Sequence, residues 1–272
     1  MIEQLLAVRL PVNNDRAWID GVCCRHTFYG ASSTTYWCIM SRVGLLLPSS
    51  NTTMEPELYM MTPRGITFHT ARMLLRIVTP EGLEEMAGEA TKAARLLKTA
   101  GVDMLAYGCT SGSLIKGVEW EKSLKRGLEK VAGVPVVTTA GAVVEGLRKL
   151  GAERISVFTP YTDEVNAVEK SFLEAHGFEV EAMSGLRLTD NQRIGMVPGE
   201  RLEAFIVPAP SSDAVFVSCT NLPVVHLIEK LEERHRLQFV TSNQATMWAA
   251  LRLLGEGGVG GFGALLREHV SA

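Results

Sequence analysis

The sequence predicts an α/β protein in two similar lobes, and three observations lead to this fold. Short runs of β-branched and apolar residues alternate with longer amphipathic stretches, which is typical of a parallel sheet flanked by helices. After about residue 42 this alternation occurs twice, and corresponding positions of the two copies carry similar residues. Two copies of such a long unit favour duplicated lobes over a solenoid. We therefore expect two Rossmann-like lobes related by a pseudo-twofold axis, each with a parallel four-stranded sheet, and an active site in the cleft between them.

The predicted elements of the first copy follow in order from residue 43. Its apolar runs predict strands at 43–47, 66–72, 103–107 and 134–138. Apolar residues at helical spacing predict helices at 81–100 and 113–131. The first of these helices comes after Pro80, at the position where a helix tolerates proline.

The second copy begins after a predicted connecting helix at 140–150. Its buried runs predict strands at 154–158, 178–183, 214–218 and 238–241. Helical spacing predicts helices at 163–176, 199–207, 222–235 and 244–254. Each strand again precedes a helix, which indicates crossover connections between parallel strands.

Three matched segments support the duplication. The segment 42–51, with its proline at Pro48, lines up with 154–163, where the proline is Pro160. Pro80-Glu-Gly lines up with Pro198-Gly-Glu, and Cys109-Thr with Cys219-Thr. The separations agree, since 61 residues separate Pro48 from Cys109 and 59 separate Pro160 from Cys219. Each copy therefore delivers one Cys-Thr pair to the end of an equivalent strand.

The repeat also predicts the domain organisation. Residues 42–139 form lobe 1, to which 244–272 return, and residues 140–243 form lobe 2. Residues 1–41 stand outside the repeat, with poor periodicity and Met40 just before the first strand, so we interpret them as an N-terminal appendage or an upstream-extended start. We expect no catalytic part for the cysteines in this segment, which are Cys23, Cys24 and Cys38.

Composition and charge exclude several classes of function. The chain has 272 residues, of which 46% are hydrophobic and 21% charged, an ordinary globular composition. The net charge is −3 and the basic residues are scattered, so the sequence shows no basic cluster of the kind that binds nucleic acid. No apolar run reaches the roughly 18 to 20 residues of a membrane span, and residues 1–20 lack a basic region followed by an apolar one, the pattern of a signal peptide. We expect a cytoplasmic protein without nucleic-acid or membrane partners.

The sequence gives no sign of a metal or a cofactor. The five cysteines include no C-x-x-C pair and the six histidines no pair at metal-ligand spacing, so we expect no metal site and no disulfide framework. No glycine-rich dinucleotide or phosphate loop follows a strand. We therefore expect a protein that uses neither nicotinamide, flavin nor ATP.

Cys109 and Cys219 are the candidate catalytic residues. Each follows a buried strand directly and precedes a predicted helix, where backbone N–H groups and the helix dipole favour a thiolate. Ligands of open parallel sheets bind at the carboxyl ends of the strands, where both cysteines fall. Alternatively, each cysteine could be a small hydrophobic residue buried in the core. The occurrence of a cysteine at two equivalent positions of the repeat favours a catalytic role.

Polar residues beside the strand ends are the candidate substrate-binding residues. The run from Pro48 to Thr53 offers hydrogen bonds suited to a carboxylate, although it could be an ordinary turn. Residues after the two cysteines offer cap oxygens and backbone donors. The Tyr161 hydroxyl could donate to a carboxylate or pack over the strand ends, and Asp163 is interpreted as the N-cap of helix 163–176. From the residues themselves the candidates are Ser49, Asn51, Thr110, Ser111, Tyr161, Thr162 and Thr220.

Taken together, these motifs resemble the Asp/Glu racemase superfamily, and within it the branch of maleate cis-trans isomerases and arylmalonate decarboxylases. The resemblance covers about residues 42–270. It lies in 43–55, 68–73, Cys109-Thr-Ser, 159–166, Asp190-Asn191 with Val197-Pro-Gly-Glu, and Ser218-Cys219. The resemblance implies a site formed by Cys109, Cys219, Asn51, Tyr161 and Asn191.

The resemblance also bears on the reaction. Arylmalonate decarboxylases lack the first cysteine and keep the second, so the presence of Cys109 favours an isomerase or racemase. The run Thr110-Ser111-Gly112-Ser113 departs from the apolar residues of maleate isomerases and is similar to racemases and decarboxylases. We predict a cofactor-independent, maleate isomerase-like enzyme that acts on a small carboxylate or dicarboxylate, and the resemblance implies a homodimer. The alternatives are an amino-acid racemase of the Asp/Glu type, an arylmalonate-type decarboxylase and a non-catalytic carboxylate-binding protein.

Overall fold

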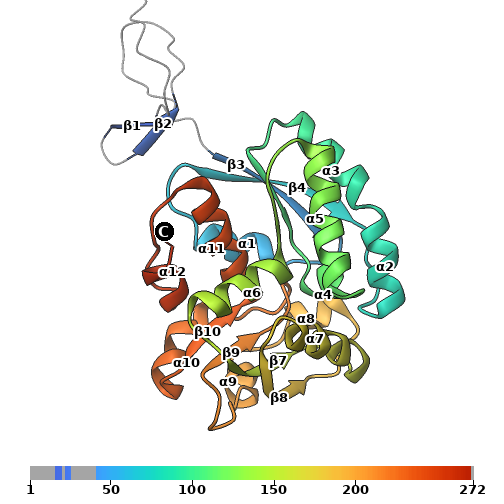
Figure 1. The fold of residues 1–272 in the computed structure, drawn as a ribbon, viewed down its shortest axis with the longest axis vertical. Coiled ribbons are helices and arrows are strands. Elements are labelled where there is room, and N and C mark those ends of the chain that lie inside the picture. The colour runs from blue at the N-terminus through green and yellow to red at the C-terminus, as the bar shows by residue number, and fades with distance from the viewer. Residues whose placement is uncertain (1–15, 20–21, 26–40, 271–272) are drawn as a thin grey trace, which may run out of the picture.

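The computed structural model describes residues 16–19, 22–25 and 41–270 and confirms the predicted fold (Figure 1). Two four-stranded sheets, each entirely parallel, lie in two lobes and carry helices around them. The first sheet has the order β4–β3–β5–β6, and the second has the order β8–β7–β9–β10. The equivalent strands of the repeat therefore occupy equivalent places in the two sheets.

The eight strands agree with the apolar runs of the sequence. The central strands β5 and β9 are buried at every residue, as expected for parallel strands covered on both faces. The strands of the first sheet are β3 (Ser41–Pro48), β4 (Ile66–Met73), β5 (Met104–Tyr107) and β6 (Val136–Thr138). Those of the second are β7 (Arg154–Thr159), β8 (Glu179–Gly185), β9 (Ala214–Val217) and β10 (Gln238–Thr241).

Two helices predicted in the first lobe are each divided in the structure. The helix predicted at 81–100 is interrupted at Glu89, whose carboxylate accepts a hydrogen bond from the Leu74 backbone N–H at 2.6 Å. The helix predicted at 113–131 is interrupted at Gly117, whose φ of 83° is open to glycine. The helices of this lobe are α1 (Met54–Met60), α2 (Pro80–Gly88), α3 (Ala90–Thr99), α4 (Thr110–Leu114) and α5 (Val118–Ala132).

The helices after β6 include two short elements that the sequence did not reveal, α8 and α12. The predicted helix at 222–235 begins later, with a 3₁₀ turn. These elements are α6 (Thr139–Lys149), α7 (Asp163–Ala175), α8 (Asn191–Gly195), α9 (Gly199–Phe205), η1 (Val225–Leu227), α10 (Ile228–His235), α11 (Ser242–Leu254) and α12 (Ala264–Glu268).

Helices α6 and α11 join the two lobes. Each follows the last strand of its sheet and is capped by a threonine, since Thr138 Oγ1 accepts from Gly141 N and Thr241 Oγ1 accepts from Gln244 N, both at 3.2 Å. The two helices pack against one another, and α11 also contacts α1, β5 and β6. The exact assignment of 42–139, 140–243 and 244–272 to lobes stays a prediction.

Before residue 41 the structure describes only a short antiparallel pair, β1 (Arg16–Ile19) and β2 (Val22–Arg25), which the sequence analysis did not predict. The rest of the predicted appendage lies outside the described residues. So do the side chains of Cys23, Cys24 and Cys38. Among the described helices, none combines the length and the apolar character needed to cross a membrane.

Candidate active site

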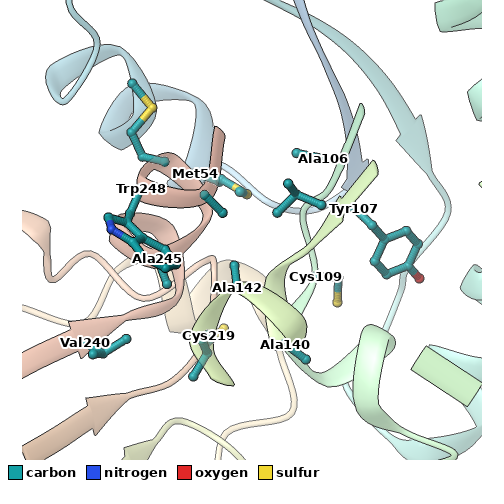
Figure 2. Packing of buried hydrophobic residues seen from close by; sticks show 14 of the residues in the cluster. Met54, Ala106, Tyr107, Cys109, Ala140, Ala142, Cys219, Val240, Ala245 and Trp248 are labelled. Carbon is teal, nitrogen blue, oxygen red and sulfur yellow. The ribbon is translucent and has the colours of Figure 1, made fainter. Parts of the chain in front are cut away.

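Cys109 and Cys219 lie where β5 and β9 end, and both line one small cavity where the lobes meet. Figure 2 shows Cys109 and Cys219 among the residues of the buried core, with their sulfur atoms in yellow. The two residues are only 5% and 7% exposed. The cavity is small and is lined by Pro48, Asn51, Leu75, Val78, Cys109, Ser111, Tyr161, Asn191, Cys219 and Thr220. The structure thus gathers both predicted cysteines and five of the predicted binding residues around one space.

Cys109 sits at the start of a helix, as the sequence predicted. It is the N-cap of α4, with an extended backbone at φ −147° and ψ 113°. Its sulfur accepts a hydrogen bond from Gly112 N at 3.3 Å and lies 3.9 Å from Ser111 Oγ. A methyl group at position 112 would come within 3.1 Å of this sulfur, so glycine permits the close approach of the helix turn.

Cys219 does not sit at a helix start, which corrects the prediction. A turn follows it, and the next helical residue is Val225. Its backbone adopts φ 102°, an uncommon conformation for a residue with a side chain and a source of strain. Its sulfur accepts hydrogen bonds from Asn221 N at 3.4 Å and from the hydroxyl of Tyr161, which is 1% exposed. The nearby N–H groups therefore come from a turn and not from a helix dipole.

Burial controls the protonation of both sulfur atoms. It raises the pKa of Cys109 to about 11, although the hydrogen bonds from Gly112 and Ser111 act in the opposite direction. It raises the pKa of Cys219 to about 12, against the lowering effect of the hydrogen bonds from Tyr161 and Asn221. The expected preference for thiolate is thus outweighed by desolvation, and both groups are thiols at neutral pH.

Asn51 is held so that its amide group faces the second lobe. Its Oδ1 accepts from the backbone N–H groups of Thr53 and Met54, at 3.1 and 3.0 Å. Its Nδ2 therefore points the other way and donates to Thr220 Oγ1 at 3.0 Å, and Thr220 Oγ1 donates to the Gly108 carbonyl at 3.1 Å. An amide nitrogen has two N–H donors. One remains for a ligand in the cavity.

Asn191 is held in a similar way by Ser50 and Asn221, two of the polar residues that the sequence places beside the strand ends. Its Nδ2 donates to Ser50 Oγ at 2.9 Å, which again leaves a second N–H donor. The backbone carbonyl of Asn191 accepts a hydrogen bond from Asn221 Nδ2 at 2.6 Å. Asn221 Oδ1 in turn accepts from the backbone N–H groups of Thr52 and Thr53, at 2.9 and 3.1 Å. Asn221 therefore binds the first loop of lobe 1 to the loop after Cys219.

Ser242, which the sequence analysis missed, connects the segments behind the two cysteines. Its Oγ accepts from Cys219 N at 2.9 Å and from Thr110 Oγ1 at 2.8 Å. Ser242 begins α11 and is 1% exposed. A single buried hydroxyl oxygen thus fixes the backbone of Cys219 relative to the first turn of α4.

One wall of the cavity is apolar and comes from an irregular segment, residues 74–79. Leu75 and Val78 are buried and face the cavity, while Leu74 and Ile77 are exposed. The segment is held by hydrogen bonds from Leu75 N to Ser49 Oγ at 3.0 Å and from Val78 N to the Thr189 carbonyl at 2.9 Å. The sequence has neither a strand nor a helix period here, so no pattern in it could have indicated this wall.

Three predicted binding residues lie outside the cavity lining. Ser49 is exposed and accepts from Leu75 N, Thr110 is buried against Ser242, and Thr162 is the partly buried N-cap residue of α7. Asp163 is therefore not the N-cap, as the sequence suggested, but the first residue of α7, where it forms an ion pair with Arg187 at 3.0 Å.

The cavity offers neutral donors and two thiols. None of its lining residues carries a charged side chain. Within the described ranges there is also no group of three His, Cys, Asp or Glu residues placed to hold a metal ion. The arrangement can hold a small carboxylate by N–H and O–H groups against an apolar wall, with two sulfur atoms beside it.

Known proteins are similar to this chain along most of its length. Residues 43–266 match the family model of arylmalonate decarboxylase. The maleate isomerase of Pseudomonas putida strain KT2440 is 32% identical over 247 residues, which cover 83% of this chain and 96% of that protein.

Two solved structures are similar along most of the chain. The maleate isomerase Iso of Pseudomonas putida S16, in a cysteine-to-alanine form with maleate, has a TM-score of 0.82 at 30% identity and covers 85% of this chain and 98% of its own. A cysteine-to-serine mutant of Nocardia farcinica maleate cis-trans isomerase has a TM-score of 0.81 at 29% identity, covering 84% of this chain and 99% of its own. That mutant carries a covalently bound succinylcysteine intermediate.

Proposed function

The chain belongs to the family of arylmalonate decarboxylases and maleate isomerases, and on that premise we propose that it isomerises maleate to the trans isomer with two cysteines and no cofactor. One observation carries the proposal: Cys109 and Cys219, from equivalent positions of a duplicated fold, line the same small cavity. Its neutral donors match the needs of a small dicarboxylate. Simple binding of a carboxylate gives no reason for a sulfur atom at both strand ends.

The first step is the addition of the Cys109 sulfur to the double bond. The Cys109 thiolate forms a C–S bond to one alkene carbon, and the electron pair of the π bond moves to the neighbouring carbon and its carboxylate. Cys219 then donates its proton to that carbon. The product of these two steps is a succinyl group on Cys109, and its central C–C bond is single. It can therefore rotate.

The second half of the reaction reverses the first. After rotation the Cys219 thiolate removes a proton from the same carbon, the double bond re-forms and the C–S bond to Cys109 breaks. The trans isomer leaves, and both sulfur atoms return to their starting protonation states. No atom or electron is gained or lost overall, so the cycle needs no cofactor.

The carboxylates are held by the amide donors of the cavity. Asn51 and Asn191 each have one N–H donor left after their structural hydrogen bonds, to Thr220 and Ser50. Tyr161 donates to Cys219 in the free enzyme and can turn its hydroxyl to a carboxylate. Leu75 and Val78 form the apolar wall of the cavity. This wall excludes water from the bound carboxylates and so strengthens their hydrogen bonds.

The raised pKa values support the two roles that the family resemblance implies, and they give the expected sign of the pH dependence. The pKa of Cys109 is about 11 and that of Cys219 about 12, so Cys109 loses its proton first. Because the thiolate is the nucleophile, the rate at saturating maleate rises with pH from neutral toward alkaline values. It falls again only when Cys219 also ionises.

A racemase of the Asp/Glu type is the second candidate, because the polar run from Thr110 to Ser113 places Ser111 in the cavity. In that reaction one sulfur removes the α-proton of an amino acid and the other returns a proton on the opposite face. The same two residues and the same cavity serve both reactions.

Proton NMR in D₂O separates the candidates. The purified protein is incubated in turn with maleate, aspartate, glutamate and a methylmalonate. We expect the maleate signal to be replaced by that of the trans isomer. Deuterium at the α-carbon of an amino acid would instead identify a racemase, and loss of CO₂ a decarboxylase. Binding without turnover of any of them would overturn the enzyme proposal.

The cell compartment and the assembly state complete the proposal. We propose a cytoplasmic homodimer. An odd number of cysteines without a disulfide framework supports a reducing compartment, and the family resemblance supports the dimer. Size-exclusion chromatography with light scattering tests the second statement.

A further inference from the structure

The first helix of each lobe buries one glutamate at an equivalent position of the repeat. Glu57 lies on α1, nine residues after Pro48, and Glu169 lies on α7, nine residues after Pro160. Their exposed fractions are 4% and 0%. Glutamate is rarely buried so completely unless it is paired. The two residues therefore invite a comparison of their partners.

Glu57 is fully hydrogen-bonded and connects the lobes. One carboxylate oxygen accepts from Val225 N at 3.0 Å, and the other accepts from Asn243 Nδ2 at 2.6 Å. Asn243 Nδ2 also donates to the Thr220 carbonyl at 3.0 Å. These bonds join α1 to η1 and to α11, so the role of Glu57 is structural.

Glu169 is different, because only one of its oxygens is satisfied. Its Oε1 accepts from Ser218 Oγ at 2.6 Å. Its Oε2 is fully buried and has no hydrogen-bond partner among the described residues. A buried polar atom without a partner costs stability, and such exceptions in native proteins call for an explanation. Structural support alone does not explain this carboxyl group.

The position of Glu169 links it to one cysteine and not to the other. Ser218 directly precedes Cys219, so the hydrogen bond from Ser218 holds Glu169 behind the end of β9. Burial is the main cause of the raised pKa of Cys219 and of Tyr161, and a negative charge on Glu169 raises both further. Cys109 owes its raised pKa to burial alone.

Few other titratable groups face Cys219. They are Tyr161 from the loop after β7 and Cys109 from the end of β5. Helix α4 packs on α7 and carries no charged side chain. The glutamates of β8, which also packs on α7, are exposed. The charge of Glu169 is therefore the one carboxylate charge that reaches this sulfur from the described elements.

We propose that Glu169 is a positioning residue that makes Cys219 the proton donor of the cysteine pair, acting through Ser218 and through its buried charge behind the sulfur. The inference rests on the proposed function, in which one sulfur bonds to the substrate and the other handles a proton. A carboxylate beside a thiol disfavours loss of the thiol proton. Cys219 thus keeps its proton while Cys109 ionises.

The test is the alkylation of each cysteine by iodoacetamide in Glu169→Gln, followed by peptide mass spectrometry from pH 6 to pH 10. Glutamine keeps the shape and an acceptor for Ser218 but removes the charge. We expect Cys219 to react roughly tenfold faster at pH 8.5, the effect of about one pKa unit. Both alkylation rates follow the thiolate fraction of the cysteine. Because the charge of Glu169 does not act on Cys109, the rate at Cys109 should change less than about twofold. The difference at Cys219 shrinks toward pH 6, where Glu169 with its pKa of about 7 is protonated in the native protein.

Glu57→Gln is the matched control, since it removes a carboxylate buried at the equivalent position and should leave both alkylation profiles unchanged. Ser218→Ala is a second variant, which keeps the charge but removes the donor that favours it. In Ser218→Ala, Glu169 ionises at a higher pH, so Cys219 reacts faster than in the native protein near pH 7.5 and equally fast near pH 9.5.

Alkylation requires no turnover, so this result is separable from that of the proposed function. If Glu169→Gln leaves the Cys219 profile unchanged, or shifts it no more than Glu57→Gln does, the inference is wrong even where the native protein isomerises maleate. If the native protein turns over no substrate, the proposed function fails and the proton-donor role fails with it.

Discussion

The two cysteines occupy equivalent positions of the repeat, yet their surroundings differ. Cys109 has an extended backbone and caps α4, where Gly112 N donates to its sulfur. Cys219 lies in a turn with φ 102°, and its sulfur accepts a hydrogen bond from the Tyr161 hydroxyl. Glu169 accepts a hydrogen bond from Ser218, the residue before Cys219. The duplication thus brings two sulfur atoms to one cavity, and the local departures from symmetry make them chemically unequal. A reaction that needs a nucleophile and a proton donor requires this inequality.

The largest expected effect comes from removing either sulfur. Cys109→Ser and Cys219→Ser should each reduce maleate turnover by about 10³-fold or more, because neither step has a substitute group. The variants should differ in what accumulates. Cys219→Ser should carry maleate bound covalently at Cys109, seen by mass spectrometry, while Cys109→Ser carries no adduct.

Cys38→Ser serves as the control, since the sequence assigns no catalytic part to that residue, and its turnover should equal that of the native protein. An adduct on Cys219 in the Cys109→Ser variant would show that the two roles are assigned the wrong way round.

The next effect concerns the two buried glutamates. Burial raises the pKa of Glu57 and of Glu169 from 4.5 to about 7. The folded state therefore binds a proton more tightly than the unfolded chain, so each residue reduces the free energy of unfolding as pH rises from about 4.5 to about 7. Each shift corresponds to roughly 3 kcal/mol. Urea unfolding should show a native protein less stable at pH 8 than at pH 5, and Glu169→Gln should remove about half of this difference.

Glu57→Gln should flatten the same pH profile, with an added loss at all pH values because its hydrogen bonds to Val225 and Asn243 weaken. Identical slopes in the native protein and in both variants would mean that neither carboxyl group is protonated on folding.

The smallest effect tests the backbone difference between the cysteines. Alanine and glycine are compared at each position, so that loss of the sulfur cancels. At position 219, where φ is 102°, glycine should be more stable than alanine by about 1 kcal/mol. At position 109, with φ −147°, glycine should be less stable by roughly 0.5–1 kcal/mol. The four variants are compared by urea unfolding. If glycine is more stable than alanine at both positions, or less stable at both, the expected difference between the two backbones is contradicted.

Much of the fold could be predicted because its strands are continuous apolar runs. The burial of β5 and β9 on both faces makes such runs unavoidable. The division of 81–100 at Glu89 could not be predicted, because the helical period of the sequence continues through it. Helix α8, five residues long, is too short to show a period at all. Local pattern thus gave the layers of the fold but not the breaks within its helices.

The site was predictable where the repeat duplicates a motif and unpredictable where two distant segments meet. Cys109 and Cys219 stand out because equivalent strands end in them. Asn221 bonds to Thr52 and Thr53 across a gap of about 168 residues, and no local pattern records that pairing. The left-handed backbone of Cys219 was also hidden, since cysteine gives no signal for positive φ as glycine does.

The hydrogen bonds that hold Asn51 and Asn191 also bear on how tightly a ligand can be held. Their bonds to Thr220 and Ser50 set the directions of the two side-chain amide groups while the chain folds. A ligand then meets donors that are already oriented, so little side-chain entropy is lost on association. Affinity can therefore come from a few neutral groups, and the dipoles need little reorganisation as charge shifts during the reaction.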